Sequence, residues 1–143
     1  MPQATRISSI MVIDSIFPNH IFNDRTLFTT YTRDPRTYTT PVGKKIKIKG
    51  TGTVVIHLTA GGWSREITLY KCWHVPTSSN NFYSCIYSTS KGWGVRLDSN
   101  YPHLVQNNGQ SGPLIPLSRS ATDRYLLNFT HIPAHEDSGC VIQ

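Results

Sequence analysis

Hydrophobic and polar residues alternate with a period of two along much of the chain, which is the pattern of β-strands. The apolar, β-branched run Ile7–Ile13 ends at Asp14 and predicts a buried strand. Thr53–Thr59 is the strongest run of this kind. The Gly61-Gly62 pair behind it predicts a hairpin turn, with Glu66–Val75 as the returning strand. The pattern therefore indicates a protein built mainly from strands.

The middle of the chain is less regular. Phe22–Tyr31 predicts an irregular loop and a short strand, and Pro35 and Pro41 bracket a section rich in turns. Gly50-Thr51-Gly52 predicts a bulge, a turn or a close backbone approach inside a strand. In the returning strand, a strict period of two puts on one face Ile67, Leu69, Lys71, Trp73 and Val75, and on the other Thr68, Tyr70, Cys72 and His74.

The second half adds one helix and several short strands. Apolar residues at Phe82, Cys85 and Ile86 have helical spacing, so we expect a short helix within Asn80–Lys91 that stops at Gly92. Strands are predicted at Trp93–Leu97 and Tyr101–Val105, which form a hairpin, and at Pro113–Leu117 and Arg124–Phe129. The predicted fold is all-β with one short helix: a small, mostly antiparallel barrel over residues 1–130, followed by a flexible tail over residues 131–143.

Composition supports one globular domain. The chain has 143 residues, of which 38% are hydrophobic and only 15% charged. The net charge of +6 would tolerate an anionic partner, and the densest basic cluster is Lys44-Lys45-x-Lys47-x-Lys49. These lysines alternate with isoleucines, as on the solvent face of a two-stranded ribbon. A nucleic-acid stripe is the alternative, but no nucleic-acid motif accompanies the lysines, so we expect no nucleic-acid partner.

The cysteines give no disulfide scaffold. Cys72, Cys85 and Cys140 are too few and too oddly spaced, and no secretory signal or membrane-length apolar run is visible. We therefore expect an intracellular, cytoplasmic protein. Cys72, His74 and Cys85 could in principle hold zinc, but their spacing matches no standard site, so we expect packing residues, no metal and no cofactor.

The last four residues, Cys140-Val141-Ile142-Gln143, fit the prenylation pattern C-a-a-X. A four-residue match also arises by chance, and no polybasic stretch precedes it. If Cys140 carries one lipid, it gives only a weak membrane tether.

An ordered set of blocks resembles the protease domain of copia-type retrotransposon polyproteins. That family has a strand running into Asp-Ser-Gly-Ala-Thr-Ser-His, then a segment like Asn-Asp-Arg-Ser-Leu-Phe, then Gly-Ile-Gly-Thr-Val. The matching blocks here are Asp14-Ser15-Ile16-Phe17-Pro18-Asn19-His20, Asn23-Asp24-Arg25-Thr26-Leu27-Phe28 and Gly50-Thr51-Gly52-Thr53-Val54. Later blocks match at Trp73-His74-Val75-Pro76, Ser79-Asn80-Asn81-Phe82 and Lys91-Gly92-Trp93-Gly94-Val95. The resemblance covers about residues 10 to 128.

The resemblance implies a retropepsin-like fold, a closed barrel that forms an obligate homodimer with one catalytic aspartate from each subunit. Two carboxylates held together share a proton, so one acts as base and the other as acid on a water molecule. The family's roles place catalysis at Asp14, with Ser15 bonding across the dimer axis. They place the ligand-binding cleft, for a peptide or small molecule, at Ile16, Phe17, His20, Gly50, Thr51 and Gly52, with Gly50–Thr53 in or beside the flap. His20 matches a recurrent histidine without an assigned role.

Ile16 departs from the family's signature glycine. A side chain there must either point into the cleft or move the loop, at a cost of a few kcal/mol if the backbone is strained. Displacing a catalytic group by about 1 Å costs roughly 100-fold in rate. We therefore expect peptide hydrolysis to be severely weakened or lost. The short chain, with no zinc-knuckle or integrase segments around the domain, leads us to expect a domesticated gene or a domain cut out of a longer protein, and not a working transposon.

Three hypotheses remain open from the sequence. The first is a repurposed dimer whose cleft binds a ligand or performs non-proteolytic acid–base chemistry, of isomerase or cyclase type, at Asp14. The second is an active aspartic endopeptidase that tolerates Ile16. The third is a non-enzymatic interaction module, tethered through Cys140 or attracted to anions through its lysines.

Overall fold

The computed structural model describes residues 7–97, 100–106 and 114–132. One eight-stranded sheet is formed by β1 (Ile7–Asp14), β2 (Ile21–Phe22), β3 (Phe28–Thr39), β4 (Lys45–Ala60), β5 (Trp63–His74), β6 (Phe82–Ser84), β10 (Ser118–Arg119) and β11 (Tyr125–His131). A three-stranded sheet contains β7 (Trp93–Arg96), β8 (His103–Gln106) and β9 (Ile115–Pro116). The helices are the 3-10 turn η1 (Arg25–Leu27) and α1 (Cys85–Ser90).

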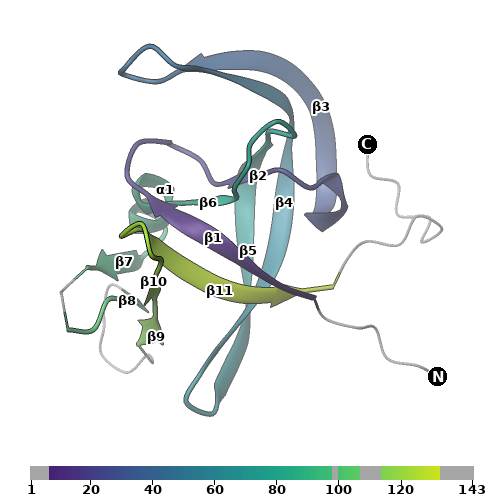
Figure 1. The fold of residues 1–143 in the computed structure, drawn as a ribbon. Coiled ribbons are helices and arrows are strands. Elements are labelled where there is room, and N and C mark those ends of the chain that lie inside the picture. Colours follow the sequence, from purple (N-terminus) through teal and green to yellow (C-terminus); the bar gives the residue numbers. More distant parts are fainter. Residues whose placement is uncertain (1–6, 98–99, 107–113, 133–143) are drawn as a thin grey trace, which may run out of the picture.

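The large sheet is strongly curved. Its strand order is β10-β11-β1-β6-β2-β5-β4-β3, and β11 also pairs with β4 through Thr130 and His57. This extra pairing joins strands from opposite parts of the sheet and makes it barrel-like (Figure 1). The predicted β-rich fold with one short α-helix is confirmed. Most pairings are antiparallel, but β1–β6 and β2–β5 are parallel.

Buried side chains form two clusters. The larger one fills the inside of the curved sheet and includes Met11, Phe22, Phe28, Ile56 and Leu127. The smaller one contains Ile21, Ile48, Trp73 and Val75, with Phe17, Tyr38, Ile46 and Phe82 packed against it. Full burial of a side chain of this size contributes about 1.5–3 kcal/mol, so the two clusters account for much of the fold's stability.

The β4–β5 hairpin confirms the strongest prediction from the sequence. Gly61 and Gly62 form its turn with φ values of 50° and 84°, which favour glycine. The predicted alternation in β5 is wrong beyond Leu69, because Lys71 has a φ of 55° and the register of β4 and β5 shifts beside it. Leu69 and Cys72 consequently both enter the larger core, where the Cys72 thiol donates to the Leu69 carbonyl at 3.3 Å.

The helix predicted within Asn80–Lys91 is shorter than its apolar spacing suggests. Phe82–Ser84 forms β6 instead, because this segment pairs with both β1 and β2. The helix then begins at Cys85, where the Ser84 hydroxyl caps it by accepting from the Tyr87 N–H at 3.0 Å. Tertiary pairing has overridden the local pattern.

The section between Pro35 and Pro41 was predicted to be rich in turns, and that is wrong. It belongs to the long strand β3, which pairs with β4 to form a hairpin whose turn is Thr40–Lys44. β3 lies at the edge of the sheet, and Pro35 falls in a register shift between Arg33 and Arg36. An edge strand with a bulge accommodates proline, because the missing N–H breaks no ladder bond.

The proposed lipid acceptor Cys140 and the tail 131–143 beyond residue 132 lie outside the described residues. Within those residues, no helix has the length and apolar character needed to cross a membrane.

Candidate functional site

The loop that follows Asp14 crosses the end of β6. β1 leads into it on one side of β6, and the chain enters β2 on the other side. The parallel pairing of β1 with β6 places Asp14 beside Ser84. From that position the Ser84 hydroxyl donates to the Phe17 carbonyl at 2.7 Å. The end of β6 therefore fixes the loop that follows Asp14.

Asp14 holds its own loop in shape. Its Oδ2 accepts from the backbone N–H groups of Ile16 at 2.9 Å and of Phe17 at 2.6 Å. These two bonds bend the chain immediately after the strand, as in an Asx-turn. Ser15 is exposed, and the Ile16 side chain is 49% exposed. Ile16 has no positive φ, so the expected backbone strain is absent, and its effect is that of a bulky side chain on the surface beside Asp14.

His20 lies underneath the loop and is completely buried. Its Nδ1 accepts from the Ser84 N–H at 2.9 Å, so the hydrogen is on Nε2, which has no partner among the described residues. The ring packs between Tyr83 and Tyr87. Burial lowers the pKa of His20 to about 3, because an imidazolium there would lose its water. His20 thus positions the loop as a neutral acceptor, and it does not line the Phe17 cleft described below.

A cleft of about 470 Å³ opens between this loop and the β3–β4 hairpin. We call it the Phe17 cleft. Its apolar floor contains Phe17, Ile21, Val75 and Phe82, and hydroxyl and amide groups of the segment Thr77–Asn80 line one side. The hairpin contributes Lys44, Lys45, Ile46 and Lys47 to its lining. Its volume lies in the range of ligand pockets in proteins, about 300–1,000 Å³.

Gly50 and Gly52 lie inside the sheet on β4, and neither they nor Thr51 line the Phe17 cleft. A carbon atom added at Gly50 would overlap the ring of Tyr31. That ring crosses over β4 from β3, and its hydroxyl bonds His74 Nδ1 on β5 at 2.8 Å. Burial, with the charges of Lys49 and Arg25, lowers the pKa of His74. The glycines therefore make room for packing across the sheet.

The structure brings some of the predicted site residues together. Phe17 lines the cleft, and Asp14, Ser15 and Ile16 form the loop beside it, whereas His20 is buried beneath and Gly50–Gly52 are in the sheet. Several residues that line the cleft were not predicted from the sequence: Lys44, Lys45, Lys47, Val75, Phe82 and Arg124. The alternating lysines were visible in the sequence, but nothing there showed that their hairpin folds over Phe17.

The cysteines in the part of the chain that the structure describes, Cys72 and Cys85, lie in unreactive surroundings. Burial raises the pKa of the Cys85 thiol, and the nearby Asp14 carboxylate raises it further. Burial likewise raises the pKa of Cys72 in the core. A nucleophilic thiolate requires the opposite shift.

A family model described as the Pol polyprotein β-barrel domain matches residues 11–93. The chain belongs to this family. The matched segment runs from β1 to the start of β7, so it includes the Asp14 loop, the β3–β4 hairpin and most of the Phe17 cleft. The domain is thus derived from a retroelement polyprotein. Neither the curated proteins nor the solved structures give a match.

Proposed function

We propose that this chain is a domesticated copia-type protease domain that has lost peptide hydrolysis and uses its cleft to bind a ligand. The observation that carries the proposal is a well-formed Phe17 cleft beside a loop whose signature glycine has become Ile16. A pocket of this size with an apolar floor is suited to a peptide or a small molecule.

The proposal includes a closed, retropepsin-like barrel that pairs with a second copy. One chain supplies a single Asp14, so an acid pair arises only through two-fold symmetry. Asp14, exposed Ser15 and half-exposed Ile16 lie together on the loop, and this loop is where the partner would pack. Two Ile16 side chains would then flank the paired carboxylates and occupy space that a scissile peptide and its water need.

Ligand binding is favoured over proteolysis because the two requirements differ. Binding needs a shaped cleft, whereas hydrolysis also needs the reacting groups within about 1 Å of their productive positions. The structure has the shaped cleft that binding needs. Hydrolysis would need a glycine beside Asp14, and the branched side chain of Ile16 stands there instead. Because Asp14 is retained, the proposal includes acid–base chemistry at its carboxylate on a bound ligand. Such a reaction would be of isomerase or cyclase type.

A peptide library tests the loss of hydrolysis. The wild-type protein is incubated between pH 4 and 7 with and without pepstatin, beside Asp14→Asn as the matched inactive variant. We expect mass spectrometry to detect no pepstatin-sensitive cleavage by either protein. Cleavage by the wild type that pepstatin and Asp14→Asn both abolish would establish the active endopeptidase instead.

A further inference from the structure

The charges around the Phe17 cleft have one sign. Lys44, Lys45 and Lys47 approach it from the hairpin, and Arg124 approaches from the turn between β10 and β11. No aspartate or glutamate is among the described residues that line the cleft. The three lysines and Arg124 are all exposed, and none is in an ion pair in the described part of the chain.

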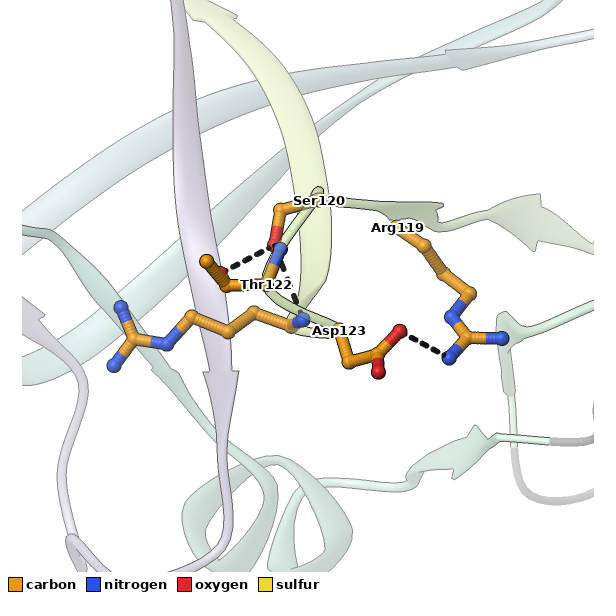
Figure 2. A network of polar contacts seen from close by, with 5 residues as sticks. Arg119, Ser120, Thr122 and Asp123 are labelled. Carbon is orange, nitrogen blue, oxygen red and sulfur yellow. Dashed lines mark hydrogen bonds and ion pairs between the residues drawn. The ribbon is translucent and has the colours of Figure 1, made fainter.

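The turn that presents Arg124 is tightly built. The Ser120 hydroxyl accepts from the N–H groups of Thr122 and Arg124 at 3.3 and 3.1 Å, and the Ser120 N–H donates to the Arg124 carbonyl at 2.8 Å. Figure 2 shows the neighbouring Asp123 turned toward Arg119, with which it forms an ion pair of 2.8 Å. The carboxylate nearest in sequence to Arg124 is therefore directed to another partner, and the Arg124 charge remains available to the cleft.

The other basic residues near the hairpin are used differently. Arg36 pairs with Asp34 at 2.9 Å and lies over the Trp73 ring. Lys49 is exposed on the same strand as the lysines but does not line the cleft. Within the described residues, four exposed basic residues without an ion pair therefore line the Phe17 cleft, whereas Arg33 and Lys49 lie outside it.

The floor of the cleft is apolar and its aromatic rings are already packed. Phe17 contacts Phe82 edge to face, with ring centroids 5.4 Å apart and planes at 61°. Phe17 contacts Tyr38 in the same way at 6.3 Å. Bases of single-stranded nucleic acid need an open aromatic face for stacking. Because the rings of the floor already pack against one another, the floor favours an aliphatic side chain of the ligand over a stacked base. The surrounding lysines and Arg124 favour carboxylates on either side of that side chain.

We propose that the Phe17 cleft binds an extended acidic peptide segment in which aspartate or glutamate residues alternate with aliphatic ones. The carboxylates reach Lys44, Lys45, Lys47 and Arg124, and the aliphatic side chains lie on Val75 and Phe82. This inference rests on the proposed ligand-binding function and adds the chemical class of the ligand.

Fluorescence anisotropy with labelled peptides tests the inference on the full chain. The probes are an alternating Glu/Leu peptide, its Gln/Leu and Lys/Leu counterparts, and a single-stranded oligonucleotide. We expect the Glu/Leu peptide to bind most tightly, and its binding to weaken as ionic strength rises, because exposed charge pairs are screened. Replacing three lysines together (Lys44→Gln, Lys45→Gln and Lys47→Gln) should weaken binding roughly tenfold, since each exposed pair contributes only modestly.

Two matched controls separate the cleft from general charge. Lys49→Gln removes a lysine from the same strand, and Arg119→Gln removes an arginine from the same turn as Arg124. We expect Arg124→Gln to weaken binding and both controls to leave it within about twofold, because isolated surface charges have small effects.

The possible results separate the acidic-peptide inference from the ligand-binding function on which it rests. If the Gln/Leu peptide binds as tightly as the Glu/Leu peptide and Ser79→Trp blocks both, the cleft binds ligands but the acidic class is wrong. Preference for the oligonucleotide, or equal losses with Lys49→Gln, overturns the acidic-peptide assignment in favour of nonspecific anion binding. If no peptide of any class binds, the acidic-peptide assignment and the peptide form of the proposed function are both wrong, and only a small-molecule ligand remains.

Discussion

Two segments that match the family's blocks behave in opposite ways. The loop Asp14–Phe17 carries Ile16 where the resembling protease signature has glycine, and Ile16 is half exposed without a positive φ. The segment Gly50–Gly52 has kept both glycines, and each lies where an added carbon atom would overlap a neighbour, the Tyr31 ring or the Thr30 carbonyl.

The difference lies in what surrounds each position within one chain. Gly50 and Gly52 are in the middle of the sheet, between β3 and β5, so the fold itself requires them. The position of Ile16 is at a surface, so the folded single chain tolerates a larger residue. Under the proposed function, a glycine there would serve the protease reaction or the partner subunit, and not the fold of one chain.

The largest effect should come from Gly52→Ala. The new methyl group would overlap the Thr30 carbonyl oxygen, a backbone atom that cannot move without disturbing the β3–β4 ladder. We expect a loss of about 3 kcal/mol or more in the free energy of unfolding, at the upper end of overpacking costs. Urea denaturation measures it.

Gly43→Ala is the matched control for Gly52→Ala. Gly43 lies at the hairpin turn with a φ of 89° and nothing near its missing side chain, so only backbone strain of about 1 kcal/mol is expected. Equal losses in the two variants would show that the close packing at Gly52 is not what the fold requires.

The next largest loss of stability is expected at His20, which lies beneath the Asp14 loop and accepts a hydrogen bond from β6. His20→Leu leaves the buried Ser84 N–H without an acceptor, at a cost of about 1–3 kcal/mol near pH 7. Because burial lowers the pKa of His20 to about 3, the unfolded chain binds a proton below pH 6.5 that the folded chain does not. Wild-type stability at this site is therefore present above pH 6.5 and falls as the pH drops toward 3.

Unfolding measured at pH 7, 5.5 and 4 separates the two contributions of His20. The free energy of unfolding of the wild type minus that of His20→Leu should fall below pH 6.5 by at most about 1.4 kcal/mol per pH unit, so it should reach zero or change sign by pH 4. His74 and His131, whose pKa values burial also lowers, are present in both proteins and cancel in the difference. A gap that stays constant with pH would mean that His20 does not remain neutral in the folded chain.

The sequence predicted the regular parts of this fold well and the tertiary exceptions poorly. The Gly61-Gly62 hairpin and the strand ending at Asp14 follow from local pattern, which is why both elements were correctly predicted. The predicted burial of that strand is wrong, because only Met11 and Val12 are buried and Ile7 and Ile10 are exposed. The reversed alternation after Lys71 and the strand at Phe82–Ser84 depend on strands distant in sequence, so no local pattern contained them. Phe17 was predicted as a site residue from its place beside Asp14 in the resembling block, whereas Arg124, which only the fold brings to the cleft, was not predicted.

A smaller effect is expected at Asp14 itself. Asp14→Ala removes the acceptor of the Ile16 and Phe17 N–H groups and should cost about 1 kcal/mol, as the loss of a cap does. Asp14→Asn keeps a side-chain oxygen and should lose clearly less. Thermal unfolding of the two variants measures the difference. Equal losses would show that the charge of Asp14, and not its oxygen, holds the loop.

The smallest effect on the dilute chain should come from Ile16→Ser. The substitution should change the free energy of unfolding by no more than about 0.5 kcal/mol, because the side chain is half exposed and its backbone is not strained. Ile86→Ser is a matched control because Ile86 is 50% exposed.

A partner copy changes this expectation, because mass action makes the melting temperature of a dimer rise with protein concentration. We expect that rise in the wild type and in Ile86→Ser, and a weaker rise in Ile16→Ser, whose side chain the partner would cover. A wild-type melting temperature independent of concentration would rule out the dimer. Ile16 would then be a surface residue of a single chain, and the comparison with Gly52 would concern the fold alone.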